Sequence, residues 1–217
     1  MNFKNLLFTS LILIGAQLFA QEEEQKEKRT TEVNTVFASN GSFGGFLSFD
    51  SKVGDINGQS SLMVGGKLSA VFSSQMNIGI VGYGLVTDLD ANTYDEDDQL
   101  FKVEMGYGGL LLEPVIANSK LIHLTTPLIL GVGGIGLRRD NWEKINDDNS
   151  LEENYHDDID TFLVFEPGLN AELNLFRNVR LNLGASYRYV YDSNIDGISD
   201  GQLSGFAANI GLKLGWF

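Results

Sequence analysis

Cysteine is absent from the 217 residues of this chain. Its absence excludes disulfide bonds, thiol catalysis, cysteine zinc sites and a lipid-bearing N-terminal cysteine. Basic residues are also scarce, because 15 Lys and Arg stand against 29 Asp and Glu and give a formal net charge of −14. Phosphate contacts need clustered Lys and Arg, so a nucleic-acid partner is excluded.

Proline is rare and long apolar runs are missing. The chain has 3 prolines and 25 glycines, a balance that suits strongly curved strands because Gly bends a strand without steric cost. No segment after the first twenty residues approaches the apolar run of about 20 residues that a membrane-spanning helix needs. A helical membrane protein is therefore excluded, and the length predicts one domain with its own core.

The first residues predict a signal peptide over 1–20. Lys4 supplies the positive charge, an apolar run follows over 6–16, and the small Ala20 precedes Gln21. An uncleaved N-terminal anchor is the alternative, although the run is shorter than a spanning helix. We therefore expect export across the inner membrane.

The mature chain divides into two parts. Residues 21–40 are rich in Glu, Gln, Lys and Thr and predict a flexible polar N-terminal tail. Residues 41–217 alternate apolar and polar side chains with a period of two, which is typical of strands with unlike faces. The clearest strands lie near 101–111, 163–175, 179–191 and 206–216, and weaker ones near 42–52, 62–72, 77–87 and 121–137; near 77–87 the pattern leaves open which face is apolar.

The links between these eight strands alternate in length. Short links are expected at 73–76, 114–120 and 177–178, and long acidic links at 53–60, 88–99, 138–160 and 192–203. Outer-membrane barrels show this alternation, with turns on the periplasmic side and loops outside. The pattern predicts an all-β fold, an eight-stranded antiparallel up-and-down transmembrane β-barrel.

The polar face predicts which side of the barrel meets lipid. Gly, Ser and Asn outnumber charges on it, so it suits a narrow, crowded interior better than a surface in water. A soluble ligand-binding barrel with its apolar face inward is the alternative. Aromatic residues at the strand ends predict interfacial girdles; they are Phe43, Phe101, Tyr187, Tyr189, Tyr191, Phe206 and Trp216.

Residues 41–217 resemble the small outer-membrane β-barrel family that includes OmpX and the OmpA transmembrane domain. The resemblance rests on the signal peptide, the rhythm of long loops and short turns, and the strand Ile210–Phe217. It implies a monomer in the outer membrane, surrounded by lipid and lipopolysaccharide. It also implies recognition of the terminal aromatic by the barrel-assembly machinery, although the apolar phase ends on Trp216 and leaves Phe217 on the opposite parity. It transfers no active-site residue.

Charged residues of both signs fall on the expected inner face. Buried charges must be paired, so we predict an ionic network in the lumen. A turn centred on Arg177 would place Glu166 opposite Arg188 and Glu172 opposite Asn182. The network either fills the lumen or lines a narrow ion-conducting channel; its expected members are Lys52, Lys67, Lys102, Glu104, Glu166, Glu172, Arg180, Arg188 and Lys213.

Acidic loops hold most of the remaining charge. Asp192, Asn194, Asp196 and Asp200 match part of an EF-hand loop, but Leu203 stands where a bidentate Glu is needed. We therefore expect at most weak Ca²⁺ or Mg²⁺ binding there and no other cofactor. Solvated, self-repelling loops are the simpler interpretation, and in a membrane with anionic lipopolysaccharide they would favour bridging divalent cations or cationic partners.

Catalytic residues are not evident in the sequence. His123 begins a strand and His156 lies beside Asp157 in the longest loop, but no serine motif of a hydrolase accompanies either histidine. Because a nucleophile, a base and an orienting group cannot be assigned together, we predict that the chain is not an enzyme; a lipid-modifying barrel enzyme is the weaker alternative. The predicted role is structural in the envelope, or surface interaction through the acidic loops.

Overall fold

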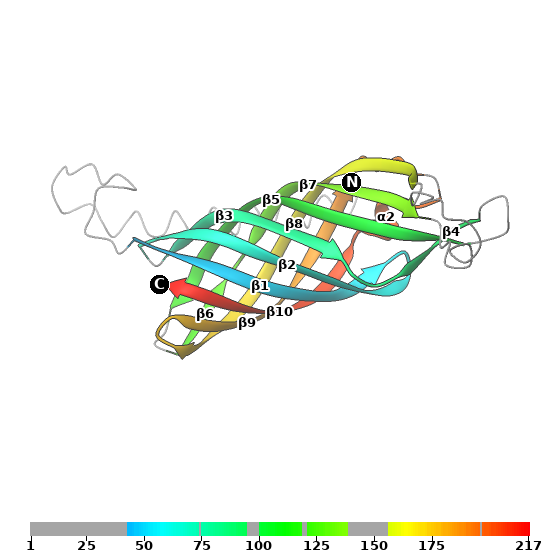
Figure 1. The fold of residues 1–217 in the computed structure, drawn as a ribbon. Helices are drawn as coiled ribbons and strands as arrows, with labels where there is room; N and C mark the ends of the chain where they lie inside the picture. Colours follow the sequence, from blue (N-terminus) through cyan, green and yellow to red (C-terminus); the bar gives the residue numbers. More distant parts are fainter. Residues whose placement is uncertain (1–42, 74, 95–99, 119–120, 139–155, 196) are drawn as a thin grey trace, which may run out of the picture. The chain divides into compact units, whose positions relative to one another are not determined.

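A single closed sheet makes up the barrel in the computed structural model, which describes residues 43–73, 75–94, 100–118, 121–138, 156–195 and 197–217 (Figure 1). All pairings between its strands are antiparallel. The elements are β1 (Phe43–Ile56), β2 (Gln59–Phe72), β3 (Met76–Leu85), β4 (Leu89–Tyr94), β5 (Leu100–Asn118), β6 (Ile122–Thr125), β7 (Leu128–Arg138), β8 (His156–Phe176), β9 (Val179–Tyr191), α2 (Asp200–Leu203) and β10 (Gly205–Trp216).

The sheet closes because β1 pairs with both β2 and β10. Strands β3 and β4 both pair with β5 and occupy one position in the ring. Strands β6 and β7 both lie between β5 and β8 and occupy another. The ten strands therefore form a ring of eight, which confirms the predicted eight-stranded antiparallel barrel.

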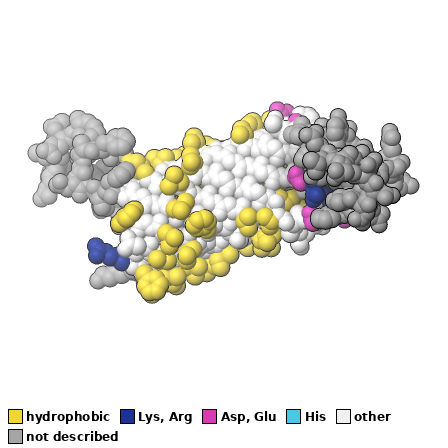
Figure 2. Space-filling model, viewed as in Figure 1, with side chains coloured by type: hydrophobic (Ala, Val, Ile, Leu, Met, Phe, Trp, Pro, Cys, Tyr) yellow, Lys and Arg dark blue, Asp and Glu magenta, His cyan; other side chains and the backbone are white. Residues whose placement is uncertain are grey.

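The outer surface of the barrel is an apolar belt. Phe49, Leu110 and Val132 are 62%, 60% and 63% exposed, and exposed Leu, Ile and Val side chains recur on every long strand. Figure 2 shows apolar side chains spread over the visible face of the barrel. Exposed apolar patches of this extent are not stable in water, whereas a closed barrel leaves no unpaired strand edge in lipid. The belt therefore faces the hydrocarbon of a membrane.

The two ends of the barrel differ. We call the end with Ser73, Gln75, Leu121 and the turn Arg177–Asn178 the turn end, and the end with the turn Asn57–Gly58, Val86–Asp88 and α2 the loop end. Exposed aromatics occur at both ends: Phe176 and Trp216 at the turn end, and Tyr189, Tyr191 and Phe206 at the loop end. The ring of Tyr187 packs edge-on against Phe206, with 4.8 Å between the ring centroids.

Strand β5 corrects one part of the predicted facing. Phe101 is only 6% exposed and points into the barrel, so it does not belong to a girdle. The apolar residues near it are inward as well, which leaves Lys102 and Glu104 on the outer face. The prediction was wrong because the interior is apolar at the loop end. There the apolar residues of an alternating strand face inward and its polar residues face outward. The side chain of Phe43 lies outside the described residues.

The links also differ in part from the sequence prediction. Residues 53–60 are not a long loop, because β1 and β2 join through the two-residue turn Asn57–Gly58. Positive φ angles of 54° at Asn57 and 72° at Gly58 give the turn type that matches the twist of a hairpin. Strand β5 runs on to Asn118, through most of the predicted 114–120 link. Within 138–160, strand β8 already begins at His156, and residues 139–155 lie outside the described residues.

Each proline lies near an irregularity of the ladder. Pro127 separates β6 from β7, because it has no N–H to donate to a neighbouring strand. Pro167 lies where the pairing of β8 with β9 skips from Phe165 to Gly168. Pro114 immediately precedes the register shift at Val115 in the pairing of β5 with β6. The few prolines therefore mark local breaks in an otherwise continuous wall.

No helix among the described residues is long and apolar enough to cross a membrane. The predicted signal peptide, 1–20, and polar tail, 21–40, lie outside the described residues.

Candidate functional site

The interior of the barrel contains paired charges, and the most deeply buried is Lys213 on β10. Its Nζ lies 2.5 Å from Glu113 Oε1 of β5 and also contacts Glu172 of β8. All three side chains are at most 1% exposed. Asn77 of β3 donates a 2.7 Å hydrogen bond to Glu113. One lysine therefore joins opposite walls of the barrel.

A second cluster lies around Lys52 of β1. Its ammonium group pairs with Glu166 of β8 and donates a 3.0 Å hydrogen bond to the Tyr107 hydroxyl. The Tyr107 hydroxyl in turn donates a 2.5 Å hydrogen bond to Glu166. The same ammonium lies 3.7 Å from the ring centroid of Tyr83, where the negative face of the ring attracts a cation. Four strands therefore meet through one buried ion pair.

A third pair joins neighbouring strands. Lys67 of β2 lies 3.4 Å from Asp50 of β1, and the Ser48 hydroxyl donates a 2.6 Å hydrogen bond to the same carboxylate. Both charged side chains are at most 4% exposed. Buried charges are tolerated only when they are paired and hydrogen-bonded, and these three clusters meet that requirement.

The β8–β9 hairpin has the predicted register, with Glu172 opposite Asn182. Arg180, one diagonal away, lies 3.4 Å from Glu172. The pairings Phe165 with Tyr189 and Gly168 with Ser186 place Glu166 at the level of Arg188. Their side chains nevertheless diverge, because Glu166 binds Lys52 and Arg188 turns toward the loop end.

Arg188 holds the segment between β9 and β10 in place. Its Nε donates a 2.9 Å hydrogen bond to the carbonyl of Leu203, and its NH2 group lies 3.4 Å from the carbonyl of Asp55. The side chain is buried at 4% exposure. A guanidinium in this position ties α2 to the end of β1.

The loop end of the interior is filled by apolar side chains, which we call the plug. Leu203 of α2, Ile195 and Ile198 are at most 4% exposed and pack in one cluster with the strand residues Met63 and Phe162. The capping box of Ser199 with Gln202 starts α2, and Gln202 also donates to Asn57 Oδ1 at 2.6 Å. The charged lumen therefore ends under an apolar layer.

Two buried acids were not found from the sequence. Asp50 was missed because the alternation near 42–52 is weak, although it shares the parity of Lys52. Glu113 was missed because the sequence predicts a link that begins at Pro114. Tyr107 belongs to the second cluster, but it shares the parity of Phe101, which the sequence assigns to a lipid-facing girdle. For Glu113 the opposite wall supplies the partner, Lys213, and strand parity alone does not identify that wall.

Lys102 and Glu104 lie on the outer face, at the loop end. Lys102 pairs with Asp90 at 2.6 Å, and Glu104 lies 2.8 Å from Arg138 Nε. Arg138 NH2 is also 3.4 Å from Asp88, whose side chain is 77% exposed. These charges form a rim above the apolar belt and take no part in the lumen clusters. Among the described acids at this end, Asp160 accepts a backbone hydrogen bond from Asn194.

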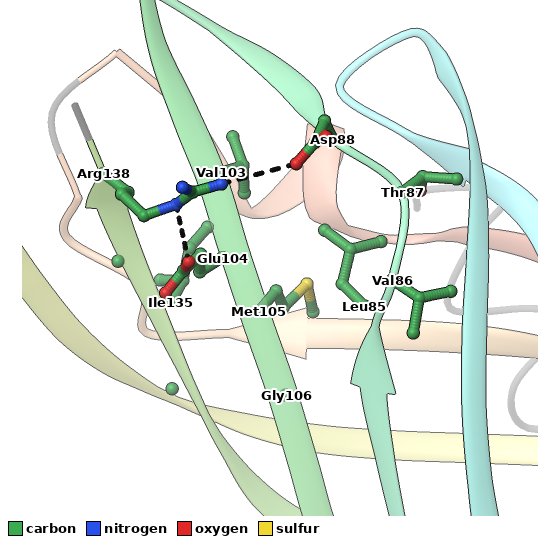
Figure 3. Close-up of a pocket in the computed structure, with 12 residues that line it drawn as sticks. Leu85, Val86, Thr87, Asp88, Val103, Glu104, Met105, Gly106, Ile135 and Arg138 are labelled. Carbon is green, nitrogen blue, oxygen red and sulfur yellow. Dashed lines mark hydrogen bonds and ion pairs between the residues drawn. The ribbon is translucent and has the colours of Figure 1, made fainter. Parts of the chain in front are cut away.

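A pocket of about 410 Å³ lies beneath this rim, between β3 and β5 (Figure 3). We call it the wall pocket. The residues that line it include Leu85, Val86, Glu104, Met105, Ile135 and Arg138. It was not foreseen from the sequence, because a local break in strand pairing leaves no pattern in the alternation.

In the 192–200 loop, the carboxylate of Asp200 is hydrogen-bonded to the backbone of the same loop. The Asp200 carboxylate accepts hydrogen bonds from the N–H groups of Ser193 at 2.9 Å and Asp192 at 3.2 Å. Within the described ranges, no group of three or more His, Cys, Asp or Glu side chains could hold a metal ion. Asp196 lies outside the described residues, so the weak divalent site stays a prediction.

His123 is buried at the turn end of the lumen. It contacts Asn174 at 3.0 Å from its Nε2 atom, and the side chain is 5% exposed. Its ladder partner across β6 and β8 is Glu172, which already binds Lys213 and Arg180. Within the described part of the chain, no serine or threonine hydroxyl is hydrogen-bonded to His123. The side chain of His156 lies outside that part.

Comparisons with known proteins support the fold. No family model matches the sequence, and no curated protein does. Among solved structures, Neisserial surface protein A is similar over 79% of this chain and 96% of its own, with a TM-score of 0.50 and 10% identity. The N-terminal β-barrel domain of OprF from Pseudomonas aeruginosa covers 79% of this chain and 99% of its own, with a TM-score of 0.47 and 8% identity.

The outer-membrane protease OmpT from Escherichia coli is a further match, over 86% of this chain and 100% of its own, with a TM-score of 0.37 and 10% identity. Likeness at this level concerns architecture and defines no activity. The closed eight-stranded ring and the apolar belt define the chain as a small β-barrel protein of the outer membrane.

Proposed function

We propose that this barrel is a closed outer-membrane scaffold that presents acidic loops to cationic partners at the cell surface. The observation that carries the proposal is the plug: Leu203, Ile195 and Ile198 fill the loop end of the interior. A filled lumen leaves the loops as the surface on which function can reside, since binding residues concentrate on loops held by a rigid scaffold.

The charge of the loop end supports a cationic partner. Asp88, Asp90 and Glu104 are well exposed there, with 77%, 44% and 47% of their side chains accessible. The adjoining link carries further acids in its sequence, namely Asp140, Glu143, Asp147, Asp148, Glu152 and Glu153. In Figure 2 the visible acidic side chains lie at this end of the apolar belt. Clustered charge of one sign attracts opposite charge and speeds association.

The orientation follows from the lengths of the links. Outer-membrane barrels place short turns in the periplasm and longer loops outside. This rule puts the acidic loop end at the cell surface, where divalent cations bridging to anionic lipopolysaccharide are a second class of partner. A non-enzymatic role is part of the proposal, because no nucleophile, base and orienting group come together among the described side chains.

The proposal is tested with cells that display the barrel and a fluorescent oligolysine peptide as the probe. The variant D140N/E143Q/D147N/D148N/E152Q/E153Q removes loop charge at constant length. We expect the wild type to bind the probe at low ionic strength and to release it as salt is added, because exposed charges are screened over about 10 Å at 0.1 M salt. The variant should bind much less.

The matched control N141S/N146S/N149S changes the same loop without changing its charge and should bind as the wild type does. Surface levels are equalised with an epitope tag in each strain. Equal probe binding by the neutralised variant and the wild type would show that the acidic loop does not attract cationic partners.

A further inference from the structure

A small cavity lies in the lumen beside the Lys52–Glu166 pair. Its volume is about 10 Å³, which is close to the space that one water molecule needs. Side chains of β3, β8 and β10 contribute to its wall, and no two of these strands are neighbours in the ring. The lining includes Lys52, Lys67, Tyr83, Glu166, Asn170 and Asn209.

Three of the lining residues carry buried polar atoms that lack a partner. Within the described ranges, no hydrogen bond reaches the Tyr83 hydroxyl, either amide atom of Asn170, or Oδ1 of Asn209. Asn170 is 1% exposed and Tyr83 is 4% exposed. Native proteins pair nearly all such atoms with protein or with ordered water, because an unpaired buried polar atom loses the hydrogen bonds that it makes in solvent. These atoms therefore call for a ligand that both donates and accepts hydrogen bonds.

The charged groups beside the cavity form two complete ion pairs. Lys52 pairs with Glu166 and Lys67 pairs with Asp50, and the four side chains are at most 5% exposed. A chloride or a sodium ion in the cavity would add an uncompensated charge to this interior, which is costly. The ligand that fits is therefore neutral as well as small.

We propose that the cavity binds one water molecule, hydrogen-bonded to the amide of Asn170, the amide oxygen of Asn209 and the Tyr83 hydroxyl. Buried waters typically make about three hydrogen bonds to groups of this kind. The water connects β3, β8 and β10 and adds to the contacts that the ion pairs make between walls. The site lies inside the barrel and does not depend on the loops binding a partner.

Two buried asparagines provide a matched pair of variants. Asn170→Leu nearly preserves the shape of the side chain but removes its donor and its acceptor. Asn182 is fully buried, and its amide atoms also lack a partner among the described residues, but it does not line the cavity. Asn182→Leu is therefore the control for removing an amide from the lumen.

The experiment uses the full-length protein in lipid nanodiscs and solution NMR of isotope-labelled asparagine amides. Cross-peaks with water are recorded in the laboratory frame and in the rotating frame, because their signs separate a bound water from proton exchange. We expect the amide protons of Asn170 and Asn209 to show the signs of a long-lived water contact. The amide of Asn77 should show none, because it is 4% exposed and donates to Glu113 at 2.7 Å.

Asn170→Leu should abolish the water cross-peak of Asn209, and Asn182→Leu should leave it unchanged. Replacing chloride with acetate in the buffer should not move the amide resonances of Asn170 or Asn209, since the ligand is neutral. A wild-type Asn170 amide without a long-lived water contact would overturn the proposal, and this result does not depend on the folding of any variant. Chloride-dependent resonances, or an Asn209 cross-peak that survives in Asn170→Leu, would overturn it as well.

Discussion

Single buried charges hold the walls of this barrel together. Lys213 is fully buried and joins Glu113 and Glu172, which belong to different strands. Desolvation of three charged groups is costly, and the ion pairs offset that cost only while all partners are present. The stability lost when one partner is removed is therefore larger than the net contribution of the intact cluster to stability.

Replacing Lys213 with Met should destabilise the barrel by about 3–5 kcal/mol, because two buried carboxylates lose their cation. The measurement is urea unfolding in phospholipid vesicles, followed by tryptophan fluorescence. Lys102→Met is the control, since the Lys102–Asp90 pair is partly exposed and should contribute at most about 1 kcal/mol. The triple variant K213M/E113Q/E172Q should recover most of the loss. A Lys213→Met barrel as stable as the Lys102→Met barrel would contradict the role given to this cluster.

At the residue scale, the sequence predicted inward-facing side chains best on strands whose apolar and polar residues alternate without a break. Glu172, Arg180 and Lys213 lie on strands whose parity is clear, and the structure places all three inside. Lys102 and Glu104 were misplaced because parity assigns residues to faces but does not say which face is inner. That distinction depends on the apolar filling of the loop end, which comes from residues far away in the chain.

At the scale of elements, the segment between β9 and β10 fills the loop end of the interior. Its residues Ile195, Ile198 and Leu203 enter the interior, and Arg188 holds the carbonyl of Leu203. The sequence predicts a solvated acidic loop over 192–203. Three apolar residues among its acids were the available signal that part of this loop is buried.

The plug predicts that the barrel does not conduct. Purified wild-type protein in planar lipid bilayers should give current at background, because apolar side chains close the loop end and ion pairs fill the lumen below. Leu203→Ala removes a fully buried side chain and should destabilise the barrel by about 2–5 kcal/mol. It should still give no current, since the lumen clusters remain. Discrete current steps in the wild type would support the narrow-channel alternative instead.

Turns and breaks show what local sequence can and cannot predict. Asn57–Gly58 is a strong hairpin signal, and it was overlooked within a link that looked long and acidic. The break between β3 and β4 has no such signal. It arises because Val86 and Thr87 bond to Leu62 of β2 instead of β5, and only the assembled sheet defines that choice.

At the scale of the whole molecule, the fold follows from pairing requirements. Backbone N–H and C=O groups find no water in a bilayer, so a sheet that spans it must close. The pairing of β1 with β10 achieves this closure, which was predicted from the period-two alternation together with the alternating lengths of the links. The C-terminal aromatic has a place inside: Phe217 stacks on Phe46 with 6.0 Å between ring centroids, and the Arg180 guanidinium lies 3.7 Å from its ring centroid.

The most direct test of a closed barrel in the outer membrane is the gel mobility of the protein with and without boiling in SDS, taken from the outer-membrane fraction. A closed barrel resists SDS when cold, because every strand edge is paired. We predict that the protein fractionates with the outer membrane and that its mobility changes on boiling. A protein that is soluble in the periplasm and migrates identically before and after boiling would contradict the account.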